Sequence, residues 1–221
     1  MRRIVILQAG LRNPSTTRML GDELAREIEA AFEEAGQGAE VRIIDIRDHA
    51  HAIADTLLTG FSEPGLQSAL DATTSADGLV VVTPTFSASY SGLFKSFIDI
   101  IEPESLIGKP VVLAATGGTE RHSLMIDHAL RPLFAYLGAE PVRTGVYAAT
   151  SDFGGAEGQI NSRIRRAAGE LVTKVLGRPA STGTNGAANG TNGAAARLAP
   201  KGFGDDLVPF EQLMGELGVG R

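Results

Sequence analysis

The chain has 221 residues, 43% of them hydrophobic, and a net charge of −6 from 20 basic and 26 acidic side chains. This size and composition predict a globular domain with a buried core, and the acidic balance argues against general nucleic-acid binding, which requires basic clusters. Cysteine is absent, which excludes disulfides, thiolate metal sites and a catalytic thiol.

The N-terminus places two arginines before a short apolar run, Ile4 to Leu7. The run is too short for the apolar part of a signal peptide and is typical of a parallel strand that is buried on both faces. No stretch of the sequence is long and apolar enough to span a bilayer. We therefore expect a cytoplasmic protein with no membrane partner.

Strands and helices alternate through residues 1–178. Short apolar runs predict strands at residues 4–7, 41–46, 79–82, 111–115 and 140–148. Apolar stripes predict helices around residues 20–32 (ended by Gly36), 66–70, 93–101, 120–137 (kinked at Pro132) and 160–175. This alternation predicts an α/β fold with a five-stranded, doubly wound parallel sheet. The loop after the first strand favours the order 2-1-3-4-5 of a flavodoxin-like three-layer α/β/α domain, which places the loops after the first and third strands around one crevice.

The composition changes after Arg178. Residues 179–202 are rich in Gly, Ala, Asn and Thr, which predicts a flexible linker because such a segment buries too little apolar surface to offset its ordering entropy. Residues 203–221 form a short tail with apolar side chains such as Phe203, Leu207 and Phe210. The tail is either a frayed end or a docking peptide, and the sequence leaves both interpretations open.

The loop after the first strand, residues 8–17, has the chemistry of a phosphate site. Ser15, Thr16 and Thr17 bring hydroxyls and N–H groups to a helix N-terminus, where the dipole favours an anion. Arg12 adds a cation. Helix capping by Ser or Thr is the simpler alternative. The loop matches neither Gly-x-Gly-x-x-Gly nor the P-loop pattern, which argues against dinucleotide and triphosphate sites of those types.

Two further loops follow the third and fourth predicted strands. Residues 83–92 are polar and carry Phe86, so their backbone and this ring suit a planar heterocycle. The alternative is a tight turn, in which Pro84 stops the strand and Ser91 caps the next helix. Residues 115–119 contain paired glycines, which allow N–H groups to approach a flat ring closely. All three loops are expected to leave the same edge of the sheet.

The residues of these loops carry a family resemblance. The run from Thr83 to Phe134, TPTFSASYSGLFKSFIDIIEPESLIGKPVVLAATGGTERHSLMIDHALRPLF, resembles NAD(P)H-dependent FMN reductases. It is most similar to the reductase components of two-component sulfonate monooxygenases and to an actinobacterial subgroup, whose phosphate loop also resembles AGLRNPSTTRML. The resemblance covers roughly residues 3–178.

The resemblance implies an FMN site built from all three loops. It assigns the FMN phosphate to Gly10, Arg12, Ser15, Thr16 and Thr17. It assigns the ribityl chain and ring to Pro84, Thr85, Phe86, Ser87 and Ala88, and the pyrimidine end of the ring to Thr116, Gly117 and Gly118. It also implies a homodimer or homotetramer, with residues 92–101 in the interface.

The implied reaction is hydride transfer from NADPH or NADH to FMN, with reduced flavin passed to a partner monooxygenase. We assign no acid–base residue, because this chemistry requires little from the protein beyond orientation. Arg12, Arg18 and Arg121 are candidates for the 2′-phosphate that distinguishes NADPH from NADH. The alternatives are a quinone, azo-dye or metal-ion reductase with bound FMN, and a flavodoxin-type electron carrier.

The sequence offers weaker support for two other chemistries. His49 and His51, near Asp45 and Asp48, form a conceivable metal site, but such clusters are more often solvated loops. A hydrolase would need a Gly-x-Ser-x-Gly elbow, which the sequence lacks. We therefore predict neither a metal site nor a hydrolase.

Overall fold

A parallel sheet in the order β2-β1-β3-β5-β6 is the centre of the computed structural model, which describes residues 1–153 and 159–178. Its strands are β1 (Arg2–Gln8), β2 (Ala39–Asp45), β3 (Gly78–Phe86), β5 (Pro110–Gly117), β6 (Glu140–Pro141) and β7 (Val146–Ala149), with β7 also paired to β5 and a short β4 (Ser89–Tyr90) paired antiparallel to β3. This order confirms the predicted flavodoxin-like arrangement. The linker and tail predicted at residues 179–221 lie outside the described residues.

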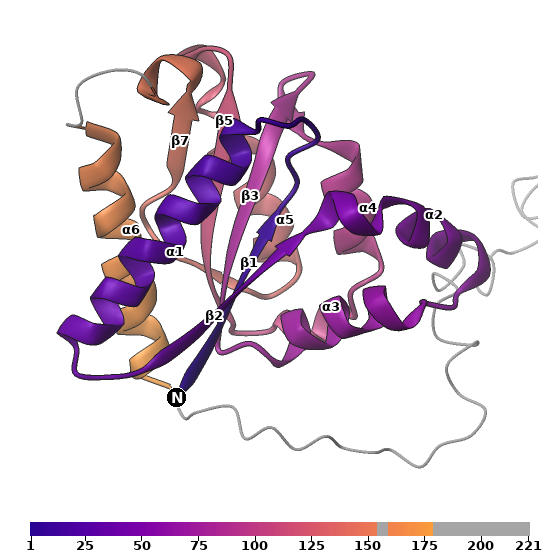
Figure 1. Cartoon of the computed structure of the whole chain (residues 1–221), viewed down its shortest axis with the longest axis horizontal. Coiled ribbons are helices and arrows are strands. Elements are labelled where there is room, and N and C mark those ends of the chain that lie inside the picture. Colours follow the sequence, from indigo (N-terminus) through magenta and orange to yellow (C-terminus); the bar gives the residue numbers. More distant parts are fainter. Residues whose placement is uncertain (154–158, 179–221) are drawn as a thin grey trace, which may run out of the picture.

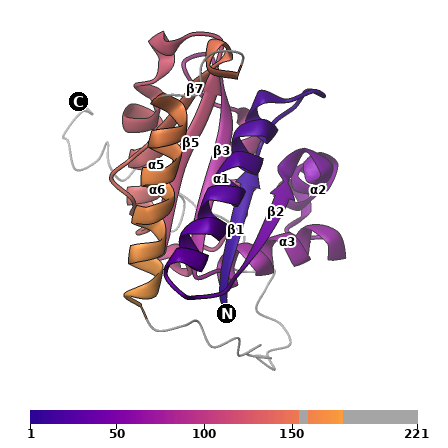
Figure 2. The ribbon, with the colours of Figure 1, turned by 60° about the vertical axis from the view of Figure 1, so that its left-hand side comes forward.

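Helices cover both faces of the sheet (Figures 1 and 2). One face carries α1 (Thr16–Glu34) and α6 (Gln159–Leu176), and the other carries α2 (Ala50–Thr59), α3 (Pro64–Ser75), α4 (Gly92–Asp99) and α5 (Arg131–Tyr136). Alternate residues of β1 serve the two cores, with Ile4 and Ile6 toward α1 and α6 and with Val5 and Leu7 toward the other layer. None of the helices in the described ranges is long and apolar enough to cross a membrane.

The helix α1 begins and ends where its sequence predicts. Ser15 is its N-cap and accepts a hydrogen bond from the N–H of Arg18, while Leu20, Leu24 and Ile28 form its buried stripe. Beyond its last turn, Gly36 adopts a positive φ of 66°, a conformation that glycine tolerates best.

The helix α2 was not predicted. His49 and His51 were interpreted as part of a solvated loop, but His49 ends a 3₁₀ turn and His51 lies in the first turn of α2. Only Ile53 and Thr56 of this helix are buried, whereas Leu57 and Leu58 are exposed. The apolar residues of α2 therefore do not form the single buried stripe on which a helix prediction depends.

The helix predicted at residues 120–137 is wrong in its first half. Residues Glu120–His122 form a 3₁₀ turn and Ile126–Leu130 a π-helical turn, so that regular α-helix begins only at Arg131. Pro132 lies at the start of α5 instead of kinking its interior. Proline lacks an N–H group and is well suited to a first helical turn, which explains why the α-helix begins at this point.

The strand predicted at residues 140–148 is divided into β6 and β7. The N–H of Val142 still donates to the Val111 carbonyl of β5 at 2.8 Å, and side chains bond the backbone groups that follow it. The guanidinium of Arg131 donates to the carbonyls of Val142 and Arg143 at 3.1 and 3.3 Å, and the N–H of Thr144 donates to Glu170 at 2.8 Å. These partners take the place of further ladder bonds to β5, and they come from α5 and α6, outside the predicted strand, so the sequence pattern alone did not reveal the interruption.

Candidate functional site

The three predicted loops leave the same edge of the sheet. Because β1, β3 and β5 are parallel neighbours, with Gln8 paired to Val82 and Pro84 paired to Thr116, their carboxyl ends lie side by side. Figure 1 shows the loop before α1, the β3–β4 hairpin and the end of β5 together at one end of the molecule. The predicted convergence is confirmed, and it lies where open α/β sheets bind ligands.

One buried hydrogen bond joins the first and third loops. The hydroxyls of Thr17, at the start of α1, and Thr116, near the end of β5, are 2.9 Å apart, and both residues are almost fully buried. A bond between two buried hydroxyls satisfies both groups and fixes the beginning of α1 relative to β5. Both threonines belong to the predicted FMN site.

The first loop combines helix capping with an anion-binding geometry. The hydroxyl of Ser15 caps α1, and the N–H groups of Thr16 and Thr17 lie in the first turn, where no helical carbonyl precedes them. A Cβ atom at Gly10 would collide with Ser15 Oγ, so only glycine allows the chain to pass this closely. Helix capping and phosphate binding are therefore compatible in this loop.

The arginines of this region differ in their availability. The side chain of Arg12 is exposed and forms no ion pair with another described residue. Arg18 donates to Asp45 at 3.2 Å and lies 4.0 Å from Asp22, so carboxylates already surround its guanidinium. Arg12 therefore remains a candidate for binding an anion, whereas binding by Arg18 would require it to exchange these partners.

The second loop departs from its predicted shape at Pro84. The strand β3 continues through Pro84 to Phe86 instead of stopping at the proline. Pro84 pairs with Thr116 of β5 and lies beyond the end of β1, where no strand on that side requires its missing N–H group. The predicted cap at Ser91 is confirmed. Ser91 is the N-cap of α4, and its hydroxyl accepts a 3.2 Å hydrogen bond from the N–H of Phe94.

The tip of the second loop has a strained backbone. Ser87 and Ala88 have positive φ values of 49° and 63°, so two successive residues other than glycine occupy the left-handed region between β3 and β4. Each such residue costs on the order of 1–3 kcal/mol, and strain of this kind is concentrated at ligand-binding sites. The turn is adjacent to Phe86, whose side chain is 45% exposed.

A buried hydroxyl with an incomplete set of hydrogen bonds lies beside the same hairpin. The Oγ1 atom of Thr85 is buried next to the Tyr147 hydroxyl, with which it forms no hydrogen bond of ordinary geometry. Buried polar atoms are nearly always fully satisfied, so this hydroxyl has capacity left for a polar ligand. Thr85 was predicted to contact the ribityl chain, whose hydroxyls are suitable partners.

Tyr147 positions the third loop and was missed by sequence reasoning. Its hydroxyl donates to the carbonyl of Thr119 at 2.9 Å, and a Cβ atom at Gly117 would collide with the same hydroxyl. Burial raises the pKa of Tyr147 above 10.0, so the group stays a hydrogen-bond donor at neutral pH. Only the register of β7, which pairs Tyr147 with Ala115, places this ring behind the loop.

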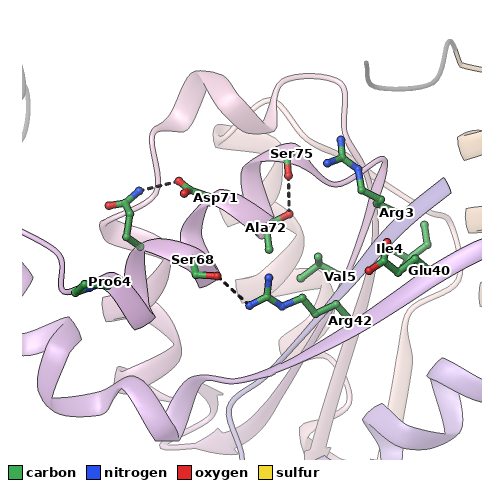
Figure 3. A pocket seen from close by; sticks show the side chains of 11 residues that line it. Arg3, Ile4, Val5, Glu40, Arg42, Pro64, Ser68, Asp71, Ala72 and Ser75 are labelled. Atoms are coloured by element: carbon green, nitrogen blue, oxygen red, sulfur yellow. Dashed lines mark hydrogen bonds between the residues drawn. The ribbon is translucent and has the colours of Figure 1, made fainter. Parts of the chain in front are cut away.

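One hollow lies away from these loops. It has a volume of about 500 Å³ and lies between α3 and the first halves of β1 and β2 (Figure 3). Arg42 donates across it to Ser68 at 3.3 Å, and Gln67 donates to Asp71 at 2.8 Å on its rim. This hollow is at the amino-terminal end of the sheet, and none of the predicted site residues line it.

The sequence comparisons identify the family that these loops resemble. Residues 2–154 match the profile described as NADPH-dependent FMN reductase. The chain belongs to this family. It is 39% identical over 181 residues to "FMN reductase (NADPH)" of Pseudomonas aeruginosa, covering 80% of this chain and 94% of the relative. It is 41% identical over 151 residues to "NADH-dependent FMN reductase SfnF" of Pseudomonas putida, covering 68% of this chain and 79% of the relative.

Solved structures of two oxidoreductases share the fold. An oxidoreductase from Corynebacterium diphtheriae superposes with a TM-score of 0.78 at 43% identity, covering 81% of this chain and 99% of the other. The NADH:FMN oxidoreductase EMOB in its apo form gives a TM-score of 0.69 at 31% identity, covering 81% of this chain and 91% of the other. The reductase therefore combines the predicted fold, the predicted enzyme class and the FMN chemistry of its family.

Proposed function

We propose that this reductase transfers hydride from NADPH or NADH to FMN held at the carboxyl edge of its sheet. The observation that carries the proposal is the convergence of three loops, joined by the Thr17–Thr116 hydrogen bond, within a chain of the FMN reductase family. FMN supplies the hydride-accepting chemistry when it is bound. The protein supplies the binding geometry and the orientation of the hydride donor.

In this proposal the first loop binds the phosphate of FMN. The N–H groups of Thr16 and Thr17 and the hydroxyl of Ser15 lie at the positive end of α1, and Arg12 adds a mobile cation. Gly10 keeps the loop close to the helix, since a larger residue would displace Ser15. The Thr17 hydroxyl is already bonded to Thr116, so its part is chiefly to position the first turn of the helix.

The second and third loops hold the remainder of the flavin. Thr85, with its buried hydroxyl, binds the ribityl chain, and the exposed ring of Phe86 packs against the isoalloxazine beside Pro84, Ser87 and Ala88. Gly117 and Gly118, with Thr116, bind the pyrimidine end. Backbone N–H groups there stabilise the negative charge that reduction brings to this end of the ring. The Tyr147 hydroxyl holds this loop through its hydrogen bond to the Thr119 carbonyl, so the backbone N–H donors require little reorganisation.

The relatives suggest where the reduced flavin goes. Two of them are named NADH-dependent FMN reductase, SfnF and SfnE. Together with the resemblance to reductase components, these names support transfer of reduced FMN to a monooxygenase. We further propose a cytoplasmic homodimer or homotetramer that uses α4 in its interface. Size-exclusion chromatography with light scattering measures the oligomeric state.

The C-terminal segment is proposed to serve this transfer. Residues 203–214 are apolar and partly acidic, and residues 179–202 have the composition of a tether. A chain truncated after Arg178 is expected to reduce FMN normally but to assemble less well or to couple poorly to a monooxygenase. Unchanged assembly and unchanged coupling would remove the docking role.

Anaerobic stopped-flow tests the proposed reaction. The protein is mixed with NADPH or NADH, with and without added FMN, and the loss of flavin absorbance is followed. We expect flavin reduction that depends on the dinucleotide and continues through multiple turnovers when FMN is in excess. An Arg12→Ala variant should have a weaker FMN affinity, by roughly tenfold for the loss of one charge-assisted contact, and an unchanged melting temperature. No flavin reduction with either dinucleotide would overturn the proposal.

A further inference from the structure

A second hollow lies on the outer side of the third loop. It has a volume of about 400 Å³ and is bounded by the π-helical turn, the connection between β6 and β7, and the helix α6. Four arginines and one aspartate are the charged residues of its lining, namely Arg131, Arg143, Arg163, Arg166 and Asp127. This concentration of positive charge contrasts with the net charge of −6 of the whole chain.

Among these arginines, Arg131 alone forms an ion pair or hydrogen bond with another residue that the structure describes. Arg131 pairs with Asp127 at 2.9 Å and also donates to two backbone carbonyls. The side chains of Arg143, Arg163 and Arg166 are exposed and form no hydrogen bond or ion pair with another described residue. Three guanidinium groups are therefore available on the lining of one hollow, where their mutual repulsion is relieved by an anion.

The hollow is connected to the proposed flavin site through Tyr147. This residue lines the hollow, while its hydroxyl bonds to Thr119 and lies against Gly117. Ser123 and Leu124, a few residues further along the same segment, also line it. A neighbouring hollow of about 220 Å³ shares Ser123, Tyr147 and Arg163, and its two carboxylates, Glu120 and Asp152, disfavour an anion there. An anion is therefore favoured at the arginine-lined end.

We propose that Arg143, Arg163 and Arg166 bind a phosphate of the dinucleotide donor, either the 2′-phosphate of NADPH or the pyrophosphate common to NADPH and NADH. The inference rests on the proposed function, because it extends that reaction to the site of its hydride donor. Guanidinium groups bind phosphate oxygens through paired hydrogen bonds, which a lysine cannot reproduce. Of the three arginines that the sequence offers for the 2′-phosphate, Arg12 belongs to the FMN phosphate loop and Arg18 is paired with Asp45. Arg121 is exposed on the Glu120–His122 turn and does not line this hollow.

Calorimetry tests the site without relying on turnover. Adenosine 2′,5′-bisphosphate and adenosine 5′-diphosphate are titrated into the full chain, its Arg166→Ala and Arg143→Ala variants, and the double variant. Each substitution should weaken binding of the relevant probe by roughly tenfold, the loss of one charge-assisted contact. The matched control is Arg165→Ala, because Arg165 lies on the same helix, pairs with Glu27 at 3.4 Å and does not line the hollow.

Steady-state kinetics then distinguish the two phosphates. A KM that rises for NADPH but not for NADH in Arg166→Ala or Arg143→Ala identifies the 2′-phosphate, and an equal rise for both identifies the pyrophosphate. Probe affinities and KM values that match those of Arg165→Ala would overturn the inference. If the chain fails to reduce FMN while the variants still lose probe binding, the site stands and the proposed reaction does not.

Discussion

Thr17 and Thr116 share a buried hydrogen bond of 2.9 Å although 99 positions separate them in the sequence. The bond joins the helix that carries the proposed phosphate loop to the strand that carries the proposed pyrimidine loop. Neither hydroxyl is accessible to solvent, so each depends on the other for satisfaction. Two ends of one flavin site are thereby held at a fixed separation.

Removing one of these hydroxyls should loosen the site. In Thr116→Val the Thr17 hydroxyl stays buried without its partner, which costs about 1–3 kcal/mol of unfolding free energy. We expect weaker FMN binding as well, because the start of α1 is no longer fixed. Denaturant unfolding and flavin fluorescence titration measure the two effects. The double variant Thr17→Val/Thr116→Val should lose less than the sum of the single variants, and additive losses would show that the bond is not a coupled unit.

Gly10 provides a test of the close approach in the first loop. In Gly10→Ala the added methyl collides with Ser15 Oγ, so the cap of α1 is displaced, with a cost of about 1 kcal/mol. FMN affinity should fall because the same residues form the proposed phosphate site. The matched control is Gly169→Ala on α6, where a Cβ atom meets nothing within 4 Å and alanine should stabilise the helix by about 0.5–1 kcal/mol. Equal FMN affinities for the two variants would argue against a phosphate role for the loop.

Tyr147→Phe tests the support behind the third loop. The variant retains the ring but loses the hydroxyl that donates to the Thr119 carbonyl. The unfolding free energy should fall by about 1 kcal/mol, and FMN affinity should fall because the Gly117–Gly118 segment gains freedom. Titration calorimetry with FMN measures this loss. Tyr136→Phe is the control, because Tyr136 is 85% exposed. A Tyr147 variant that binds FMN like the control would remove Tyr147 as a positioning residue.

Lys109 stabilises the end of α3 at a distance from the site. Its ammonium donates to the carbonyls of Thr73, Thr74 and Ala76 at 3.2, 2.7 and 2.9 Å, which satisfies groups that the helix leaves unpaired. Lys109→Met should lower the unfolding free energy by about 2 kcal/mol at pH 7, because buried carbonyls lose their donor. Thermal unfolding of the two proteins measures the difference.

The same lysine predicts a pH dependence. Burial lowers the pKa of Lys109 from 10.5 to about 8. Between these values the unfolded chain binds more protons than the folded one, so the contribution of this group to stability rises with pH, by up to ~1 kcal/mol per pH unit. The unfolding free energy of the wild type should therefore rise relative to Lys109→Met from pH 8 to pH 10. A constant difference would mean that the pKa of Lys109 is close to its ordinary value.

Sequence patterns located the central strands and most helices because their signals are local. The apolar run from Ile4 to Leu7 predicts a buried strand, and the cap at Ser15 predicts the start of α1. One of the errors occurs where side chains outside a segment decide its local structure. Arg131 and Glu170 interrupt the strand predicted at residues 140–148 by bonding its backbone, and neither lies within that segment.

Some features of the candidate site were likewise predicted from the sequence, and others appear only in the folded structure. The sequence by itself determined the alternation of strands and helices and the identity of three polar loops, because these follow from short-range periodicity and motif spacing, and the residues of those loops carry the family resemblance. Only the tertiary structure decided that Thr17 bonds to Thr116, that Tyr147 supports Gly117 and that three arginines line one hollow. These relationships join residues from separate strands and helices, and parallel pairing and side-chain packing create them only when the sheet is assembled.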